Sequence, residues 1–271
     1  MPAAPVTQED VRRYHEDGFV CFPRFFDTNA VSRLRAGIDA AIASHRERIV
    51  GAEKGGRFSE DYERVFNQMV NLWTDSPAAK EFTFDERLGE TARRLAGCGE
   101  IRLYHDHAMI KPAGQQSKET NWHQDAPYWP MDPVGSLSAW IAVDDVSVDN
   151  GCLHFVPGSH RHGKLEPIKL GVEGESIVDK MRQQGYEVAP PRPIEMEAGG
   201  VTFHHGCNFH YAGPNTTAAP RRAFAVIFIP DYVRFTGGNE AAGAGDQMEA
   251  GGPWDHPLHP VLAAGPVGET P

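Results

Sequence analysis

Beyond residue 100 the chain consists of short strand-like runs separated by residues that favour turns. The runs cover residues 101–111, 136–146, 200–204 and 222–229. Clusters of glycine, proline, serine and asparagine lie between them, at residues 112–114, 149–151 and 157–159. Many short strands can bury their apolar faces only by pairing into a sandwich or a closed barrel. We therefore expect an antiparallel β core.

Helical signals dominate the first hundred residues. Thr7 and Asp10 have the spacing of a capping box, which predicts a helix from Gln8 to about Asp17 that Gly18 ends. Residues 19–22 read as a strand. A second helix is expected from Thr28, because apolar residues then recur at spacings of three and four, at Val31, Leu34, Ile38 and Ile42.

A third helix is expected after Ser76-Pro77, which supply a cap and a first-turn proline, with Leu88, Ala92 and Leu95 on one face. Residues 47–70 have no clear period and are interpreted as a loop near a pocket. The 271 residues are expected to form one domain, in which helices at about 7–97 buttress a core at about 100–235. The tail at 237–271 is expected to be an arm or a flap.

Charge and composition restrict the partners of the chain. With 26 Lys and Arg against 37 Asp and Glu, the formal charge is −11, which argues against a nucleic-acid or anionic-membrane partner. No apolar stretch approaches the ~18 residues of a membrane span. We expect a cytoplasmic protein with packed, reduced cysteines, because no basic, apolar leader begins the chain and no C-x-x-C pair occurs among Cys21, Cys98, Cys152 and Cys207.

The strongest chemical signal is the run Asn-Trp-His-Gln-Asp at residues 121–125. Side chains two apart on a strand point to the same side, so His123 and Asp125 can reach one ion together. Two histidines and one carboxylate with open positions is the arrangement of non-haem iron(II) oxygenases. A third ligand is available in the region 203–210, where the sequence offers three histidines: His204, His205 and His210.

Three motifs in order resemble the phytanoyl-CoA dioxygenase family of 2-oxoglutarate oxygenases over roughly residues 8–235. The W-H-x-D motif matches residues 122–125, and the N-G-x-L-x-x-x-P-G-S-H motif matches residues 150–160. The distal motif matches His210, the run 213–215 and Arg221. This resemblance implies a mainly β protein with flanking helices, built on a double-stranded β-helix, the cupin-like jelly roll.

The resemblance also implies a ligand set and an activity. The iron(II) ligands would be His123, Asp125 and His210, with 2-oxoglutarate as cosubstrate and O2 as oxidant. The expected reaction is hydroxylation of a C–H bond in a small organic molecule, with release of succinate and CO2. Related halogenases lack the carboxylate at the position of Asp125, so its presence favours hydroxylation, desaturation or rearrangement over halogenation.

Four residues are expected at the cosubstrate. Arg221 falls at the position of the family's 2-oxoglutarate-binding arginine, and its planar guanidinium suits a carboxylate. Arg222 should face the opposite side of the strand. The resemblance further places Trp140 and His107 beside the cosubstrate, and Gln68 is considered for the same pocket. Ala212 replaces a small hydroxyl residue of the family, so one hydrogen bond to 2-oxoglutarate must be missing or come from elsewhere.

The substrate is not readable from the sequence. Residues close to the metal motif are candidates for contact with it: Tyr104, Gln124, Tyr128, Trp129 and Met131. A competing zinc site at His105 and His107 would need a third ligand. Two other functions remain open, namely a metal enzyme of the same fold that does not use 2-oxoglutarate and a non-catalytic ligand-binding homologue. The oligomeric state is not predicted.

Overall fold

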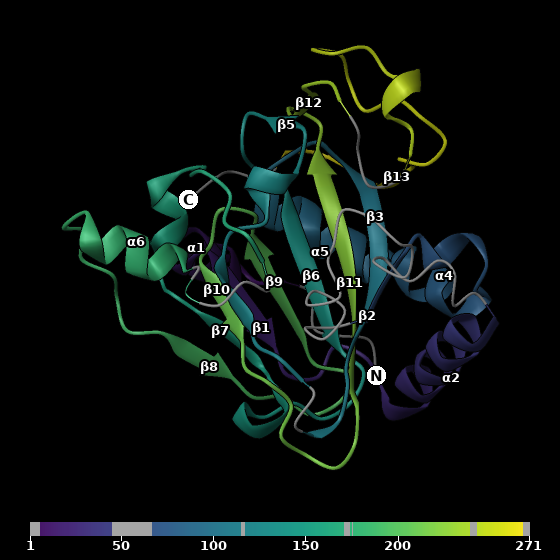
Figure 1. Ribbon diagram of the computed structural model, residues 1–271. Coiled ribbons are helices and arrows are strands. Elements are labelled where there is room, and N and C mark those ends of the chain that lie inside the picture. The colour runs from purple at the N-terminus through teal and green to yellow at the C-terminus, as the bar shows by residue number, and fades with distance from the viewer. Residues whose placement is uncertain are drawn as a thin grey trace.

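The computed structural model describes residues 6–44, 67–114, 117–170, 174, 176–238 and 243–267. Within these ranges, seven strands form a larger sheet in the order β1-β9-β6-β11-β3-β13, with β2 also paired to β3. A smaller sheet has the order β4-β10-β7-β8, and β12 pairs with β5. Neighbours in each sheet are antiparallel and mostly far apart in sequence, which is the connectivity of a jelly roll (Figure 1). The predicted fold class is confirmed.

The strands that carry this topology are short apart from two long central ones. The larger sheet comprises β1 (Phe19–Phe22), β2 (Asn67–Val70), β3 (Glu100–Lys111), β6 (Leu137–Ala142), β9 (Val201–His205), β11 (Arg221–Pro230) and β13 (Val261–Ala264). The other strands are β4 (Thr120–His123), β7 (Leu153–Phe155), β8 (Arg192–Ile194), β10 (His210–Ala212), β5 (Met131–Asp132) and β12 (Arg234–Phe235).

Helices cover the outer faces of the two sheets. The N-terminal ones are α1 (Gln8–Asp17), α2 (Thr28–Ser44), α4 (Pro77–Thr83) and α5 (Glu86–Ala96). Their apolar faces and the outer face of the larger sheet bury one core cluster, which includes Leu34, Phe82 and Leu95. A further helix, α6 (Ile177–Gln183), lies outside the smaller sheet and packs on Phe209 and Val156 (Figure 1). None of the described helices is long and apolar enough to cross a bilayer.

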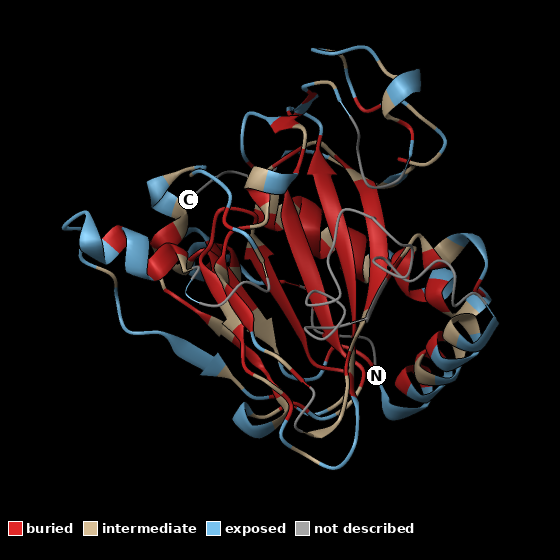
Figure 2. Ribbon diagram, in the orientation of Figure 1, coloured by how far each residue is buried: buried red, intermediate tan, exposed pale blue. Residues whose placement is uncertain are grey.

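A second core cluster fills the space between the sheets. Phe19 of β1 and Phe155 of β7 stack across it, with ring centroids 4.6 Å apart. Strand β11 contributes to both clusters by alternation: Phe224, Val226 and Phe228 face the helices, whereas Ala223, Ala225 and Ile227 face the interior. Small inward side chains on this central strand leave interior volume for larger groups. In Figure 2 the central strands are mostly red, because most of their residues are buried.

Several helix boundaries can be compared with those that the local sequence predicts. The α1 helix has the expected bounds because Thr7 and Asp10 form the capping box and Gly18 adopts the left-handed conformation, with φ of 81°. The third expected helix is instead two, since Asp85 caps a new helix after α4 ends. Residues 67–70 form strand β2 and not a loop, while residues 47–66 lie outside the described residues. In the tail, β13 pairs with β3.

We predict that Leu34→Ala lowers the free energy of unfolding by about 2–5 kcal/mol, because it leaves a cavity in the outer core. Leu34 lies on α2 with no exposed surface. Urea unfolding should show a lower midpoint with an unchanged slope. Val134→Ala, at a side chain 38% exposed, is the control and should change stability by less than about 0.5 kcal/mol. Equal losses in both variants would contradict this assignment of the core.

Candidate metal centre

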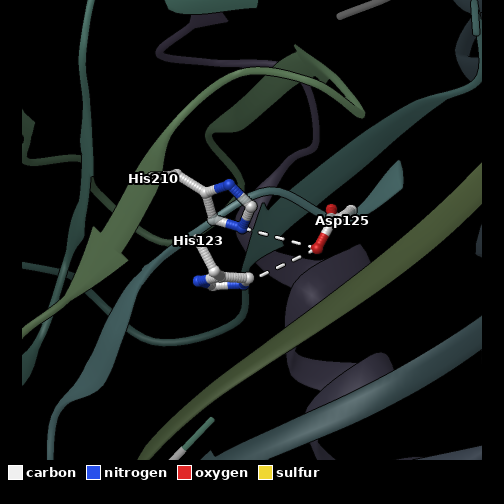
Figure 3. Close-up of side chains that lie close together, drawn as sticks. All are labelled: His123, Asp125 and His210. Carbon is white, nitrogen blue, oxygen red and sulfur yellow. Dashed lines mark ion pairs between the residues drawn. The ribbon is translucent and has the colours of Figure 1, made fainter. Parts of the chain in front are cut away.

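Three potential metal ligands lie close together beside the paired strands β4 and β10 of the smaller sheet. His123 ends β4 and His210 begins β10, and the two residues lie opposite each other in the antiparallel pair. Their ring centroids are 4.0 Å apart, and each Nε2 lies 3.6 Å from Oδ1 of Asp125 (Figure 3). The three ligand atoms lie within 4.8 Å of one another. Among the described residues, this is the one group of three His, Cys, Asp or Glu side chains so placed.

Asp125 reaches this position by a turn and not by strand alternation. Strand β4 ends at His123, and Asp125 has helical backbone angles, with φ of −81° and ψ of −41°. Its N–H and that of Ala126 both donate to the carbonyl of Gly206, at 2.9 and 2.8 Å. The expectation that His123 and Asp125 lie on one side is therefore met, but the physical reason differs. The chain bends around Gly206 and so turns the carboxylate toward the histidines.

Backbone carbonyls orient both imidazoles. Nδ1 of His123 lies 2.6 Å from the carbonyl oxygen of Asn121, and Nδ1 of His210 lies 3.0 Å from that of Asn208. A carbonyl can only accept a hydrogen bond, so each Nδ1 carries the ring proton. Each Nε2 is therefore the ring nitrogen turned toward Asp125 and the one available to a metal. Histidine ligands of protein-bound metals are commonly held in this way, by a hydrogen bond from the nitrogen that does not bind the metal.

The electrostatics also suit a divalent cation. Burial lowers the pKa of His210 to about 3, and the adjacent His123 ring acts in the same direction. Burial by itself would raise the pKa of Asp125, but the rings of His210, His123 and His204 outweigh it and hold this pKa well below the usual range of a carboxyl. Neutral imidazoles and an ionised carboxylate are the forms that bind metal. The donor set fits iron(II), for which two histidines and one carboxylate are typical.

The neighbouring histidines have other contacts. Nε2 of His204 lies 3.3 Å from Oδ2 of Asp125, and the Ser138 hydroxyl donates to the same oxygen at 3.2 Å. His204 thus holds the carboxylate oxygen that is turned away from His123 and His210. Nδ1 of His205 accepts a hydrogen bond from the N–H of Cys207 at 3.0 Å. Of the three histidines in the region 203–210, His210 is the one in the three-residue group.

Arg221 enters the interior as expected, and Arg222 does not. The Arg221 guanidinium is buried, lies 5.4 Å from the centre of the Trp140 ring, and donates to the carbonyls of Gly151 and Asn150 at 3.1 and 3.4 Å. Burial lowers its pKa to about 10. Arg222 pairs with Asp39 and Asp144 on the outer side.

Lys111 is a second buried cation that the sequence reasoning missed. It ends β3 directly opposite Arg221 in the strand register. Its Nζ donates to the carbonyl of Lys118 at 2.8 Å, and burial together with the charge of Arg221 lowers its pKa well below the usual value. Strand parity contains the signal that could have identified it, because Lys111 is two and four residues beyond inward-facing positions 109 and 107.

His105 and His107 face the same interior. Their Nδ1 atoms lie 3.4 Å apart, and both rings are buried. Burial lowers the pKa of His107 to about 4 and that of His105 well below its usual value. In the described part of the chain they form no three-ligand group, so the competing zinc site lacks its third ligand. The side chain of Gln68 lies outside the described residues. Its backbone, in β2, pairs with Met109 of β3.

The five substrate candidates have different environments. Tyr104, Trp129 and Met131 are buried in the interior cluster, where the Tyr104 ring contacts Trp129 at 6.2 Å between centroids. Tyr128 is 42% exposed, and its hydroxyl donates to the carbonyl of Ile168. Gln124 is buried, and both of its amide hydrogens go to backbone carbonyls. Three of the five candidates therefore lie in the interior, whereas the amide of Gln124 is bonded to the backbone of other segments.

Comparisons with known proteins agree with this geometry. The family model described as "Phytanoyl-CoA dioxygenase (PhyH)" matches residues 14–223. A probable phytanoyl-CoA dioxygenase of Caenorhabditis elegans is 30% identical over 240 residues, covering 83% of this chain and 76% of that protein. An ectoine dioxygenase of Bordetella bronchiseptica is 28% identical over 251 residues, covering 83% of this chain and 76% of the relative.

Solved structures show the same fold. The non-haem α-ketoglutarate-dependent carbocyclase SnoK from nogalamycin biosynthesis has a TM-score of 0.79 at 25% identity, covering 97% of this chain and 99% of its own. EctD from S. alaskensis, with 2-oxoglutarate and 5-hydroxyectoine, has a TM-score of 0.68 at 21% identity, covering 87% of this chain and 80% of its own, and shows the fold alone. The chain belongs to the phytanoyl-CoA dioxygenase family and is an iron(II)- and 2-oxoglutarate-dependent oxygenase.

Proposed function

We propose that His123, Asp125 and His210 hold iron(II), and that the enzyme hydroxylates a C–H bond of a small organic molecule. The convergence of two Nε2 atoms and one carboxylate oxygen within 4.8 Å carries this proposal. Iron(II) and 2-oxoglutarate, when bound, supply the oxidising chemistry, in which O2 is consumed and succinate, CO2 and a hydroxylated product are released. Three protein ligands leave further coordination positions for the cosubstrate and O2.

The protein's own contribution is to orient the ligands and exclude water. His204 and the Ser138 hydroxyl hold the second oxygen of Asp125, so that the first faces the histidines. The rings of His123 and His210 are buried, with 6% and 5% of their surface exposed. Groups held in advance in a dry site need little rearrangement when the metal binds. The same burial protects a reactive centre from bulk solvent.

Arg221 is the proposed partner of the distal carboxylate of 2-oxoglutarate. No carboxylate among the described residues forms an ion pair with it, and the buried Lys111, whose pKa is lowered by burial and by the charge of Arg221, stands opposite it in the strand register. Burying a guanidinium without a carboxylate partner is costly, and a dianionic cosubstrate relieves that cost. Trp140 supplies the ring beneath the guanidinium, and His107 lines the same interior. Lys111 is our candidate for the hydrogen bond that Ala212 cannot supply, and a role for Gln68 stays a prediction.

The substrate pocket that we propose is lined by neutral groups. Tyr104, Trp129 and Met131 lie in the interior cluster, and His105 is held neutral by burial. Such walls suit a small, moderately apolar molecule. Desaturation or rearrangement would use the same residues. Three further expectations stay predictions: a single domain, no nucleic-acid or membrane partner, and a cytoplasmic location. The four free cysteines accord with a cytoplasmic location.

One experiment separates this proposal from its alternatives. Anaerobic addition of iron(II) and then 2-oxoglutarate should produce the weak visible charge-transfer band of a chelated cosubstrate. A same-fold metal enzyme that does not use 2-oxoglutarate would bind iron without developing the band. A non-catalytic homologue without a metal would bind neither. A substrate screen that follows succinate release would then identify the class of molecule oxidised.

We predict that His123→Ala, Asp125→Ala and His210→Ala each abolish succinate production and iron retention. Because the ligands act as a unit, double variants should lose no more activity than single ones. His205→Ala should retain a measurable fraction, because that ring bonds to the Cys207 N–H and lies outside the three-residue group. Iron content and succinate release measure both properties. An iron-free His205→Ala beside an active His210→Ala would overturn the ligand assignment.

Zinc, cobalt or nickel should bind at the same site and inhibit. Divalent affinity at nitrogen and oxygen ligands rises toward copper, so selectivity for iron does not come from raw affinity. Zinc has no accessible redox change and so cannot support O2 chemistry. The measurement is substrate turnover by zinc-loaded protein whose residual iron has been quantified. Substantial turnover without iron would contradict the oxygenase mechanism.

Arg221→Ala should weaken 2-oxoglutarate binding by about 30- to several-thousand-fold. Breaking a buried, hydrogen-bonded charge pair costs roughly 2–5 kcal/mol, at about 1.4 kcal/mol per factor of ten. Arg221→Lys should fall between, since it keeps the charge but loses the two-pronged geometry. Titration of 2-oxoglutarate into iron-loaded protein measures the effect, and iron binding should survive in both variants.

Arg222→Ala is the matched control, because Arg222 pairs with Asp39 and Asp144 outside the interior. It should leave cosubstrate affinity nearly unchanged while losing a surface ion-pair network. A large loss in Arg222→Ala with normal affinity in Arg221→Ala would show that the wrong arginine has been assigned.

A further inference from the structure

Gln124 stands between two proposed metal ligands in the sequence, yet its side chain turns away from them. It is 1% exposed. Its Nε2 donates to the carbonyl of Cys207 at 2.8 Å and to that of Gly163 at 2.7 Å. Its Oε1 accepts from the N–H of Leu165 at 3.0 Å. Both amide hydrogens are therefore used on backbone groups, and none is left for a bound molecule.

The bond to Cys207 joins the two segments that carry the metal ligands. His123 and Asp125 flank Gln124, and Cys207 precedes His210 by three residues. Two backbone bonds already run from Asp125 and Ala126 to the carbonyl of Gly206. Gln124 adds a third link beside them, made by a side chain. The Gln124 side chain therefore helps to set the separation between His123 on β4 and His210 on β10, and a substitution can remove its hydrogen bond.

The other two bonds tie the metal segment to residues 163–168. The same two stretches are joined by the Lys164 ammonium, which donates to the carbonyl of Trp129 at 3.3 Å. They are joined again by the Tyr128 hydroxyl, which donates to the carbonyl of Ile168 at 2.6 Å. Residues 163–168 lie in the connection between β7 and β8, which also carries α6. Gln124 is thus the point where three separate stretches of chain meet.

We propose that Gln124 is a positioning residue for the metal centre: its amide clamps the segment 123–126 to the segment 206–210 and to residues 163–165. This inference rests on the proposed ligand set. Removing the amide leaves the buried carbonyl of Cys207 and the partly buried carbonyl of Gly163 without this donor. The ligand-bearing segments then lose their fixed separation. Metal affinity falls more than the loss of overall stability would explain.

The test uses cobalt(II) as a redox-stable probe on the metal-free full-length chain. Gln124→Met keeps length and volume but removes all three hydrogen bonds, and Gln124→Asn keeps an amide that is one methylene too short. Outer groups that orient metal ligands typically contribute tenfold to hundredfold to affinity. We expect Gln124→Met to weaken cobalt binding by about tenfold or more in calorimetry. Its visible cobalt bands should also change shape, which reports altered ligand geometry.

Two controls separate positioning from general stability. Leu34→Ala destabilises the outer core on α2, far from the site, and should leave cobalt affinity within about twofold of wild type. Lys164→Met removes a link on the 163–168 side alone and should leave the cobalt bands unchanged. If Gln124→Met does not fold without metal, Gln124→Asn is measured instead, with the thermal midpoint recorded with and without cobalt.

The outcomes are distinct. Weaker binding and altered bands in a Gln124 variant, beside normal binding in Leu34→Ala at a similar loss of stability, support the clamp. Wild-type affinity and bands in a folded Gln124 variant overturn it, and leave the amide with a structural role only. Failure of the wild-type chain to bind cobalt would instead overturn the ligand set on which the proposed function depends.

Discussion

Strand alternation in β3 and β11 determines which side chains reach the interior and which meet the helices. On β11, Arg221 shares the inward face with Ala223 and Ala225, while Arg222 shares the outward face with Phe224. A shift of one residue would exchange the two sets and put the Phe224 side chain where Ala223 or Ala225 now faces the interior. The apolar outward face, packed on α2, α4 and α5, holds this register. The chemistry of the interior therefore depends on packing on the other side of the sheet.

A bulge in β3 interrupts this alternation, so that two adjacent side chains face the interior. The register with β11 shifts between Ile227 and Phe228, which lie opposite His105 and Leu103. Tyr104 and His105 consequently both reach the interior, although they are adjacent in sequence. Asp106 turns outward and accepts from the Thr83 hydroxyl. One extra residue thus adds an aromatic ring to the walls without displacing the neighbouring imidazole.

The interior concentrates groups that are expensive to bury. Arg221 and Lys111 lie opposite each other with pKa values lowered by burial, and burial likewise lowers the pKa of His210 beside Asp125. Proteins retain such groups where a ligand of opposite charge compensates for them. The relatives are named for different substrates, since they include a probable hypophosphite dioxygenase and ectoine dioxygenases. The shared fold and donor set therefore define the class of reaction and leave the substrate to individual side chains.

The sequence by itself determined the features that depend on local spacing. The capping box of α1, the strand-like runs beyond residue 100, and the two candidate ligand blocks are all short-range patterns. Only the tertiary structure decided what depends on pairing between distant segments. The turn of Asp125 around Gly206, the place of Lys111 opposite Arg221, and the three bonds of Gln124 join residues that are tens of positions apart. Such contacts follow from strand register and loop packing, which no local pattern of residues encodes.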